Sequence, residues 1–120
     1  AGATARAQVG HWRDSESLYR RAIAVTDGNW VAEYGLALSL GEEDRGEEAL
    51  LHYREAVRIK PGYFEALNGL GVEHARQGNL TQAEARFREA VMVKPDVVEA
   101  CLNMGMVMLS RGSEEEAAAW

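Results

Sequence analysis

Three histidines and one cysteine have side chains that commonly bind metal ions or act as nucleophiles: His11, His52, His74 and Cys101. Zinc sites draw on ligands at short spacings, typically with two to four residues between neighbouring ligands. The two closest of these residues, His52 and His74, are 22 positions apart, so the spacing predicts no metal site. Because Cys101 is the only cysteine, an internal disulfide is excluded. We expect His74 and Cys101 to be buried packing residues.

Three short motifs could suggest other chemistry. The Gly-Leu-Gly motif at 69–71 lacks the third glycine of a phosphate loop and lies within a helical pattern. Met104, Met106 and Met108 could bind a soft metal, but alternate residues of a helix point in different directions. The glutamate run at 114–116 is better explained by the dipole of a helix N-terminus. We therefore predict no catalytic residue, no cofactor and no metal.

The composition excludes two classes of partner. The net charge is -6, whereas nucleic-acid binding and docking on an anionic membrane both need a basic surface. No apolar stretch is long enough to cross a bilayer. Hydrophobic residues make up 47% of the 120 residues, which is enough for the core of one domain. We predict no nucleic-acid partner and no direct membrane contact by this chain.

The elements that position these residues follow a 34-residue period. Pro61 and Pro95 are 34 residues apart. The same step relates three further series: Ala22, Ala56 and Ala90; Tyr19, Tyr53 and Phe87; Leu36, Leu70 and Met104. Several independent series with one period indicate a repeat architecture in which each unit is a supersecondary structure.

Each period contains two helical patterns separated by a turn. In the period at 64–97, Gly78 interrupts the first pattern, Thr81 and Glu84 form a capping box that opens the second, and Pro95 ends it. The same pattern predicts a part-helix at about 1–9, helices near 13–26, 30–41, 47–60, 63–77, 81–94 and 97–111, and another from about 114. A second capping box, Ser113 with Glu116, marks that last helix.

Two stretches, ALNGLGVEHARQGNLTQAEARFREAVMVKP and YGLALSLGEEDRGEEALLHYREAVRIKP, resemble the tetratricopeptide repeat (TPR) family, and the resemblance covers the whole chain. It implies an all-α fold, a right-handed superhelical solenoid of antiparallel helix pairs. We expect a single domain, 1–120, that comprises a partial repeat (1–29), two full repeats (30–63 and 64–97) and a truncated repeat (98–120). One departure is Asp44, which stands where other turns have glycine, so we expect a looser turn there.

The alternation of alanine and aromatic residues has a packing reason. Helices approach closely only where side chains are small, and large rings fill the space beside the contact. We predict that Ala56 and Ala90 are fully buried, with Tyr53 and Phe87 filling the space beside them.

The resemblance also implies a peptide-binding groove lined by the first helix of each pair. Spacing of i, i+3, i+4 and i+7 places an outward stripe on these helices: Val31, Tyr34, Gly35 and Leu38; Glu65, Asn68, Gly69 and Val72; Glu99, Leu102, Asn103 and Met106. Some TPR proteins bind a peptide's terminal carboxylate with Lys, Arg and Asn on this stripe, but here it has no Lys or Arg. We expect a protein or peptide ligand, extended or helical, with apolar anchors and basic flanks. The alternative is a solvated face, or one covered by another part of the parent protein.

Three functions follow from the resemblance. The chain is a protein–protein interaction scaffold, a structural spacer, or an accessory domain. The stretch AQVGHWRDSESLYRRAIAVTDGNW resembles the junction in membrane-embedded, glycosyltransferase-like proteins that have a TPR tail. A scaffold would fit the cytoplasm, whereas such a tail would lie outside it, so the compartment stays open.

The end of the chain leads to one more expectation. The sequence starts without methionine and stops at Trp120 within a helical pattern, which is typical of an excised fragment. The last helix would then leave Cys101, Met104 and Met108 without cover. We expect self-association through this C-terminal end, with Trp120 buried in the contact.

Overall fold

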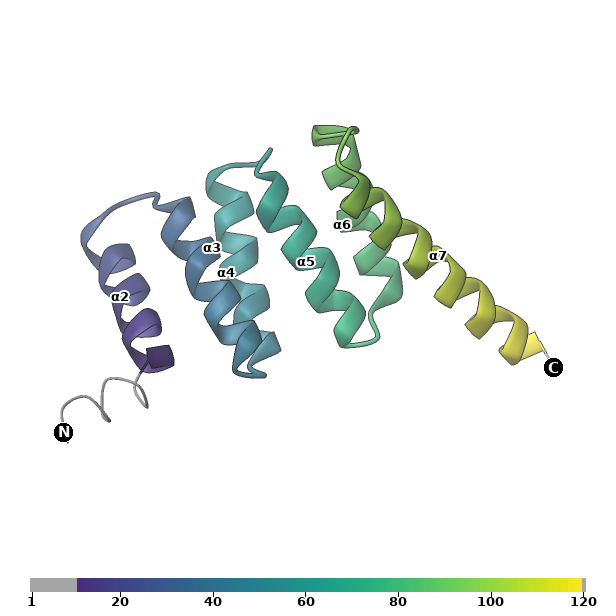
Figure 1. Ribbon diagram of the computed structural model, residues 1–120, viewed down its shortest axis with the longest axis horizontal. Coiled ribbons are helices and arrows are strands. Elements are labelled where there is room, and N and C mark those ends of the chain that lie inside the picture. Colours follow the sequence, from purple (N-terminus) through teal and green to yellow (C-terminus); the bar gives the residue numbers. More distant parts are fainter. Residues whose placement is uncertain (1–10, 120) are drawn as a thin grey trace. The chain divides into compact units, whose positions relative to one another are not determined.

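The computed structural model describes the backbone of residues 11–119, and every regular element in that range is an α-helix (Figure 1). The helices are α2 (His11–Val25), α3 (Trp30–Glu42), α4 (Gly46–Ile59), α5 (Phe64–Arg76), α6 (Leu80–Val93) and α7 (Val98–Ala119). The predicted all-α class is confirmed, and α2 to α6 begin and end within two residues of the predicted bounds. The part-helix expected at about 1–9 and Trp120 lie outside the described residues.

The chain divides between Ile59 and Lys60 into two compact units. The first unit contains α2, α3 and α4, and α3 packs against both of the other helices. Its core is made by fully buried small and large apolar residues, among them Leu36, Leu40, Ala49 and Ala56. The predicted burial of Ala56 is confirmed.

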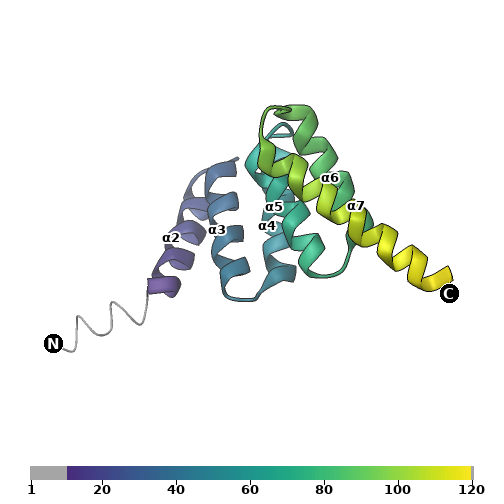
Figure 2. The same ribbon diagram turned by 45° about the vertical axis from the view of Figure 1, so that its right-hand side comes forward.

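The second unit contains α5, α6 and α7, and α6 packs against both neighbours (Figure 2). Ala83, Phe87 and Val107 form one buried cluster, with Met104 and Val72 packed against it. Ala90 is fully buried, as predicted. Ala56 and Ala90 of the alanine series therefore occupy core positions, one in each unit.

Glycine permits the closest contacts between helices. A Cβ atom added at Gly71 would lie 2.5 Å from the Phe87 ring, and one added at Gly35 would lie 2.4 Å from the Tyr19 ring. Real Cβ atoms essentially never approach that closely. Each glycine is thus the surface on which an aromatic ring of a neighbouring helix lies.

The turn at Asp44 is the same as the turn at Gly78. Asp44 has a φ of 62° and Gly78 a φ of 79°. In each turn the following N–H bonds back to a helix carbonyl at 2.9 Å, Arg45 to Leu40 and Asn79 to His74. This is the left-handed closure of a helix C-terminus. The expected looser turn at Asp44 is wrong, because aspartate is one of the few residues that tolerate this conformation.

The prediction that a turn at Gly112 separates two helices is also wrong. Helix α7 continues unbroken to Ala119, and Gly112 does not have the positive φ found at Gly78. The segment 113–119 consists of serine, glutamate and alanine. Glutamate and alanine have high helix propensity, so this segment favours continuation of the helix.

Candidate protein-binding surface

In the first unit, the outward stripe lies on α3. Its start is fixed by Asn29, whose side-chain oxygen accepts a hydrogen bond from the Ala32 N–H at 3.0 Å. Val31 is 60% exposed and Leu38 is 41% exposed, whereas Tyr34 is partly buried with its ring 5.9 Å from that of Tyr53. The stripe thus presents two aliphatic side chains to solvent.

In the second unit, the stripes of α5 and α7 meet. The side-chain N–H of Asn103 donates a hydrogen bond to the side-chain oxygen of Asn68 at 3.4 Å. Leu102 is 62% exposed and Met106 is 66% exposed, whereas Val72 packs against the buried cluster. The structure therefore brings the two predicted asparagines together beside two exposed apolar residues.

The charge along this surface is acidic. Glu65 and Glu99 are exposed, and no stripe residue is cationic. The Lys94 ammonium lies 3.6 Å from the Glu65 carboxylate and 5.2 Å from the centre of the Phe64 ring. This ion pair compensates the charge of Glu65, and Glu99 is the stripe carboxylate that lies outside the ion pairs of the described residues.

Two single-residue predictions had opposite outcomes. His74 is 3% exposed, which confirms its assignment as a buried residue. Cys101 is exposed, so its assignment as a buried packing residue is wrong, whereas the expectation that it lacks cover at the C-terminal end is confirmed. The physical reason is the uninterrupted α7: the helix that would have returned over Cys101 continues away from it instead.

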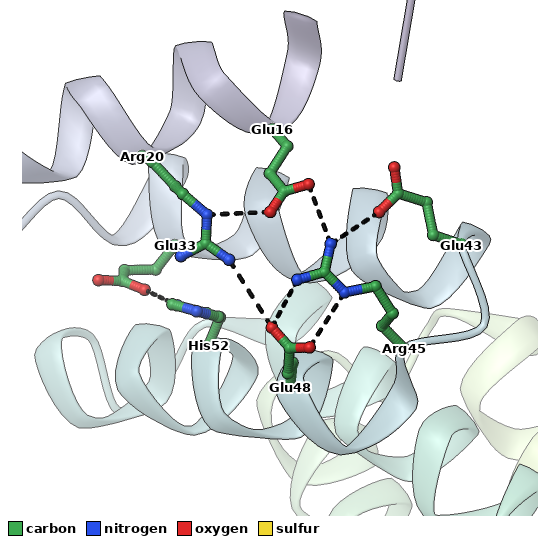
Figure 3. Close-up of polar contacts among 7 residues, drawn as sticks. All are labelled: Glu16, Arg20, Glu33, Glu43, Arg45, Glu48 and His52. Atoms are coloured by element: carbon green, nitrogen blue, oxygen red, sulfur yellow. Dashed lines mark hydrogen bonds and ion pairs between the residues drawn. The ribbon is translucent and has the colours of Figure 1, made fainter. Parts of the chain in front are cut away.

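The sequence analysis missed a network of ion pairs in the first unit (Figure 3). The Arg45 guanidinium donates to Glu48 at 2.7 Å, to Glu16 at 3.0 Å and to Glu43 at 3.1 Å, while Arg20 donates to Glu16 at 3.0 Å. Glu16 and Arg20 belong to α2, Glu48 belongs to α4, and the other two follow α3. The network therefore ties α2 to the α3–α4 pair.

These contacts shift the acid–base equilibria of the network. The hydrogen bond from Arg45 holds the pKa of Glu48 below its usual value. Burial by itself would raise the pKa of Glu16, but hydrogen bonds from Arg20 and Arg45 outweigh it and leave that pKa lowered. The hydrogen bond to Glu48 in turn raises the pKa of Arg45. All three groups stay charged at neutral pH.

A second pair in this unit is more deeply placed. His52 Nδ1 lies 2.7 Å from a carboxylate oxygen of Glu33, and Glu33 is 6% exposed. The pair joins α3 to α4. Within one helix, the sequence could have indicated only the pair of Arg20 with Glu16, which are four residues apart on α2.

In the second unit, Glu84 has a different role from the one predicted. Helix α6 begins at Leu80, so Thr81 lies inside it and the predicted capping box is wrong. The Glu84 carboxylate instead accepts hydrogen bonds from Arg88, at 2.7 Å, and from Arg111 of α7. A buried carboxylate is more stable with charged donors than with one backbone N–H.

These features agree with the comparisons with known proteins. A family model described as "Tetratricopeptide repeat" matches residues 1–64 and 68–120, and the chain belongs to this family. No curated protein matches its sequence. Among the described residues, no helix is both long and apolar enough to cross a membrane.

Several solved structures share the fold at low sequence identity. The first TPR of Spaghetti (RPAP3), bound to the HSP90 peptide SRMEEVD, has a TM-score of 0.82 and 15% identity over 91% of this chain and 86% of its own. The second TPR domain of human RPAP3, in complex with the HSP70 peptide SGPTIEEVD, has a TM-score of 0.77 and 19% identity, with 88% of both chains covered. The Arabidopsis OM64 TPR domain has a TM-score of 0.80 and 19% identity, over 89% of this chain and 88% of its own.

Proposed function

We propose that this chain is a protein-interaction module, and that it binds an extended or helical protein segment on the outward stripe of α5 and α7. The observation that supports this most is the exposure of Leu102 and Met106 beside the Asn68–Asn103 pair. Covering an exposed side chain of this size with an apolar partner stabilises a complex by roughly 1.5–3 kcal/mol. The stripe of α3, with Val31 and Leu38 exposed, offers a further contact of the same kind in the first unit.

The charges favour one class of ligand over another. The peptides bound by the two similar RPAP3 domains, SRMEEVD and SGPTIEEVD, both end in acidic residues. Here Glu65 and Glu99 line the stripe without a cationic residue among its members. An acidic terminus would meet like charges, whereas a basic flank would gain favourable pairs. The ligand we propose has apolar anchors, basic flanks and no need for a free carboxylate.

A displayed library of random peptides tests this proposal. We expect selection on the 1–120 chain to enrich peptides with apolar anchors and Lys or Arg nearby. Binding should be lost in Met106→Asp, because a buried carboxylate without a partner is costly. Met92→Asp is the matched control, since Met92 is 77% exposed on α6, away from the stripe. Equal loss in both variants, or no enrichment, would contradict the proposal.

The terminal carboxylate is tested separately. The selected peptides are titrated with free and with amidated C-termini, and we expect similar affinities because no stripe residue is a cationic donor. A strong preference for the free acid would show that the ligand class is wrong.

A further inference from the structure

Met106 gives the outward stripe of α7 a side chain that a mild oxidant can modify. It is 66% exposed, and Leu102 and Leu109 lie one helical turn before and after it. All three residues line one hollow on α7, and none of the residues that line this hollow is charged. An oxygen atom added to the Met106 sulfur would therefore lie on an apolar surface that offers it no cationic donor.

The 34-residue period indicates that the position of Met106 stays open when another helix packs on its repeat. Its counterparts are Leu38 on α3 and Val72 on α5, and both of these helices pack against a following helix. Leu38 is nevertheless 41% exposed, and Val72 is only partly buried. Met108 differs, because its counterpart on α5, His74, is 3% exposed. A helix packed on α7 in the same way would cover Met108 and leave Met106 accessible.

The other three methionines lie outside the stripe. Met92 is 77% exposed on α6, Met108 is 48% exposed on α7, and Met104 packs partly buried against the cluster in the core of the second unit. Oxidation of a thioether depends on its access to solvent, so Met92 and Met106 should react before Met104. Met106 is therefore the methionine whose oxidation changes the proposed binding surface, and Met92 is an exposed reference on another helix.

We infer that Met106 is a modification site through which hydroperoxides regulate ligand binding, because its sulfoxide weakens the hold of the stripe on an apolar ligand. This inference rests on the proposed function of the stripe. With hydrogen peroxide, the Met106 sulfur attacks one peroxide oxygen, so that a sulfur–oxygen bond forms and the oxygen–oxygen bond breaks. The proton of the transferred oxygen goes to the departing hydroxide, which leaves as water.

The exchange of electrons balances, and its product is polar. The sulfur loses two electrons and the peroxide gains them. Oxidation converts an apolar side chain into a polar one. In the complex, the new oxygen of Met106 would be covered by an apolar anchor of the ligand, and a buried polar group without a hydrogen bond is costly.

The probe is the tightest peptide from the random-peptide selection, labelled with a fluorophore and titrated by fluorescence anisotropy. The chain has Cys101→Ser in every measurement, so that oxidation of a thiol does not contribute. The dose of hydrogen peroxide is one at which mass spectrometry finds sulfoxide at Met106 and none at Met104. We expect binding to weaken about tenfold or more after oxidation. Bound peptide should also slow the oxidation of Met106 and leave the rate at Met92 unchanged.

Two sets of variants assign the effect to one sulfur atom. Met92→Leu combined with Met108→Leu removes the exposed methionines outside the stripe and should keep the full response to peroxide. Met106→Leu is judged by the ratio of its Kd after peroxide to its Kd before, which should be about 1 because no oxidisable sulfur remains on the stripe. The thermal midpoint of the free chain should not change on oxidation of Met106, since this side chain is exposed.

The outcomes distinguish this inference from the proposed function. The inference is overturned if oxidation of Met106 leaves peptide binding unchanged, if Met106→Leu loses affinity on oxidation as much as the parent chain does, or if Met106 stays reduced while Met92 is oxidised. In each of these cases the unoxidised chain still binds the peptide, and the proposed function stands. If the selection enriches no peptide, the proposed function fails and this inference fails with it.

Discussion

The two units are built on the same repeat and differ at their edges. Their interiors match position by position: Ala56 and Ala90 are fully buried, and Tyr53 and Phe87 are at most 5% exposed. Their edges do not. In the first unit, ion pairs around Arg45 tie α2 to its neighbours, whereas in the second, α7 leaves Leu102, Met106 and Leu109 largely exposed. Residues that recur every 34 positions form the interiors of both units, whereas residues that do not recur make the surfaces of the two units different.

The sharpest test of the interior match is to overpack both units. Ala90→Leu should lower the free energy of unfolding by about 1–3 kcal/mol, because a fully packed crossing has no room for three more carbons. Ala56→Leu should cost a similar amount, since both alanines are 0% exposed. Urea titration of the two variants measures this. An unaltered midpoint for Ala90→Leu would show that the assigned packing face is incorrect.

A substitution in the turn at Asp44 should have a smaller effect, and it should raise rather than lower the free energy of unfolding. Asp44→Gly should raise the free energy of unfolding by about 0.5–1 kcal/mol, since glycine adopts the positive φ without the strain that a Cβ brings. The reciprocal change, Gly78→Asp in the second unit, should lower stability by a comparable amount. If both substitutions destabilise, the Asp44 carboxylate contributes more than its backbone strain costs.

The ion pairs of the first unit should give the smallest effect, one that depends on pH. The pKa values of Glu16 and Glu48 are lowered from the ordinary value of 4.5 in the folded chain. The stability that they contribute is therefore present above that pH and lost as pH falls through the lowered values. Arg45→Gln should lower the thermal midpoint at pH 7 and have progressively less effect in acid.

A matched substitution in the second unit sharpens this comparison. Arg86 pairs only with Glu89 among the described ion pairs, so Arg86→Gln should change the midpoint less than Arg45→Gln at pH 7. A difference between wild type and Arg45→Gln that persists unchanged to pH 2 would rule out the carboxylates as its origin.

The sequence predicted what depends on the period. Helix bounds, the buried alanines and the burial of His74 all follow from local spacing, because a helix places every third or fourth residue on one face. The stripe residues were located by the same spacing, and their role in binding stays a proposal.

The features that the 34-residue period did not predict depend on contacts between residues distant in sequence, or on which of two local structures forms. The contact of Arg45 with Glu16 spans 29 residues, and no local pattern encodes it. Local spacing predicted that Glu84 would form a capping box with Thr81. In the structure, Glu84 instead accepts a hydrogen bond from Arg111, which is distant in sequence. The presence of Gly112 did not determine whether the chain turns there or continues as one helix. The chain continues as α7, and Cys101 is exposed.

The hydrogen bond between Asn68 and Asn103 has a consequence for which groups of a ligand the stripe would recognise. A side-chain amide has the same donor and acceptor groups as a peptide bond, and one mutual contact uses only part of them. The pair can therefore bind the main chain of a segment whatever side chains that segment has. Sequence preference would then come from the apolar residues beside the amides, and the amides themselves would set only where along the stripe a chain is held.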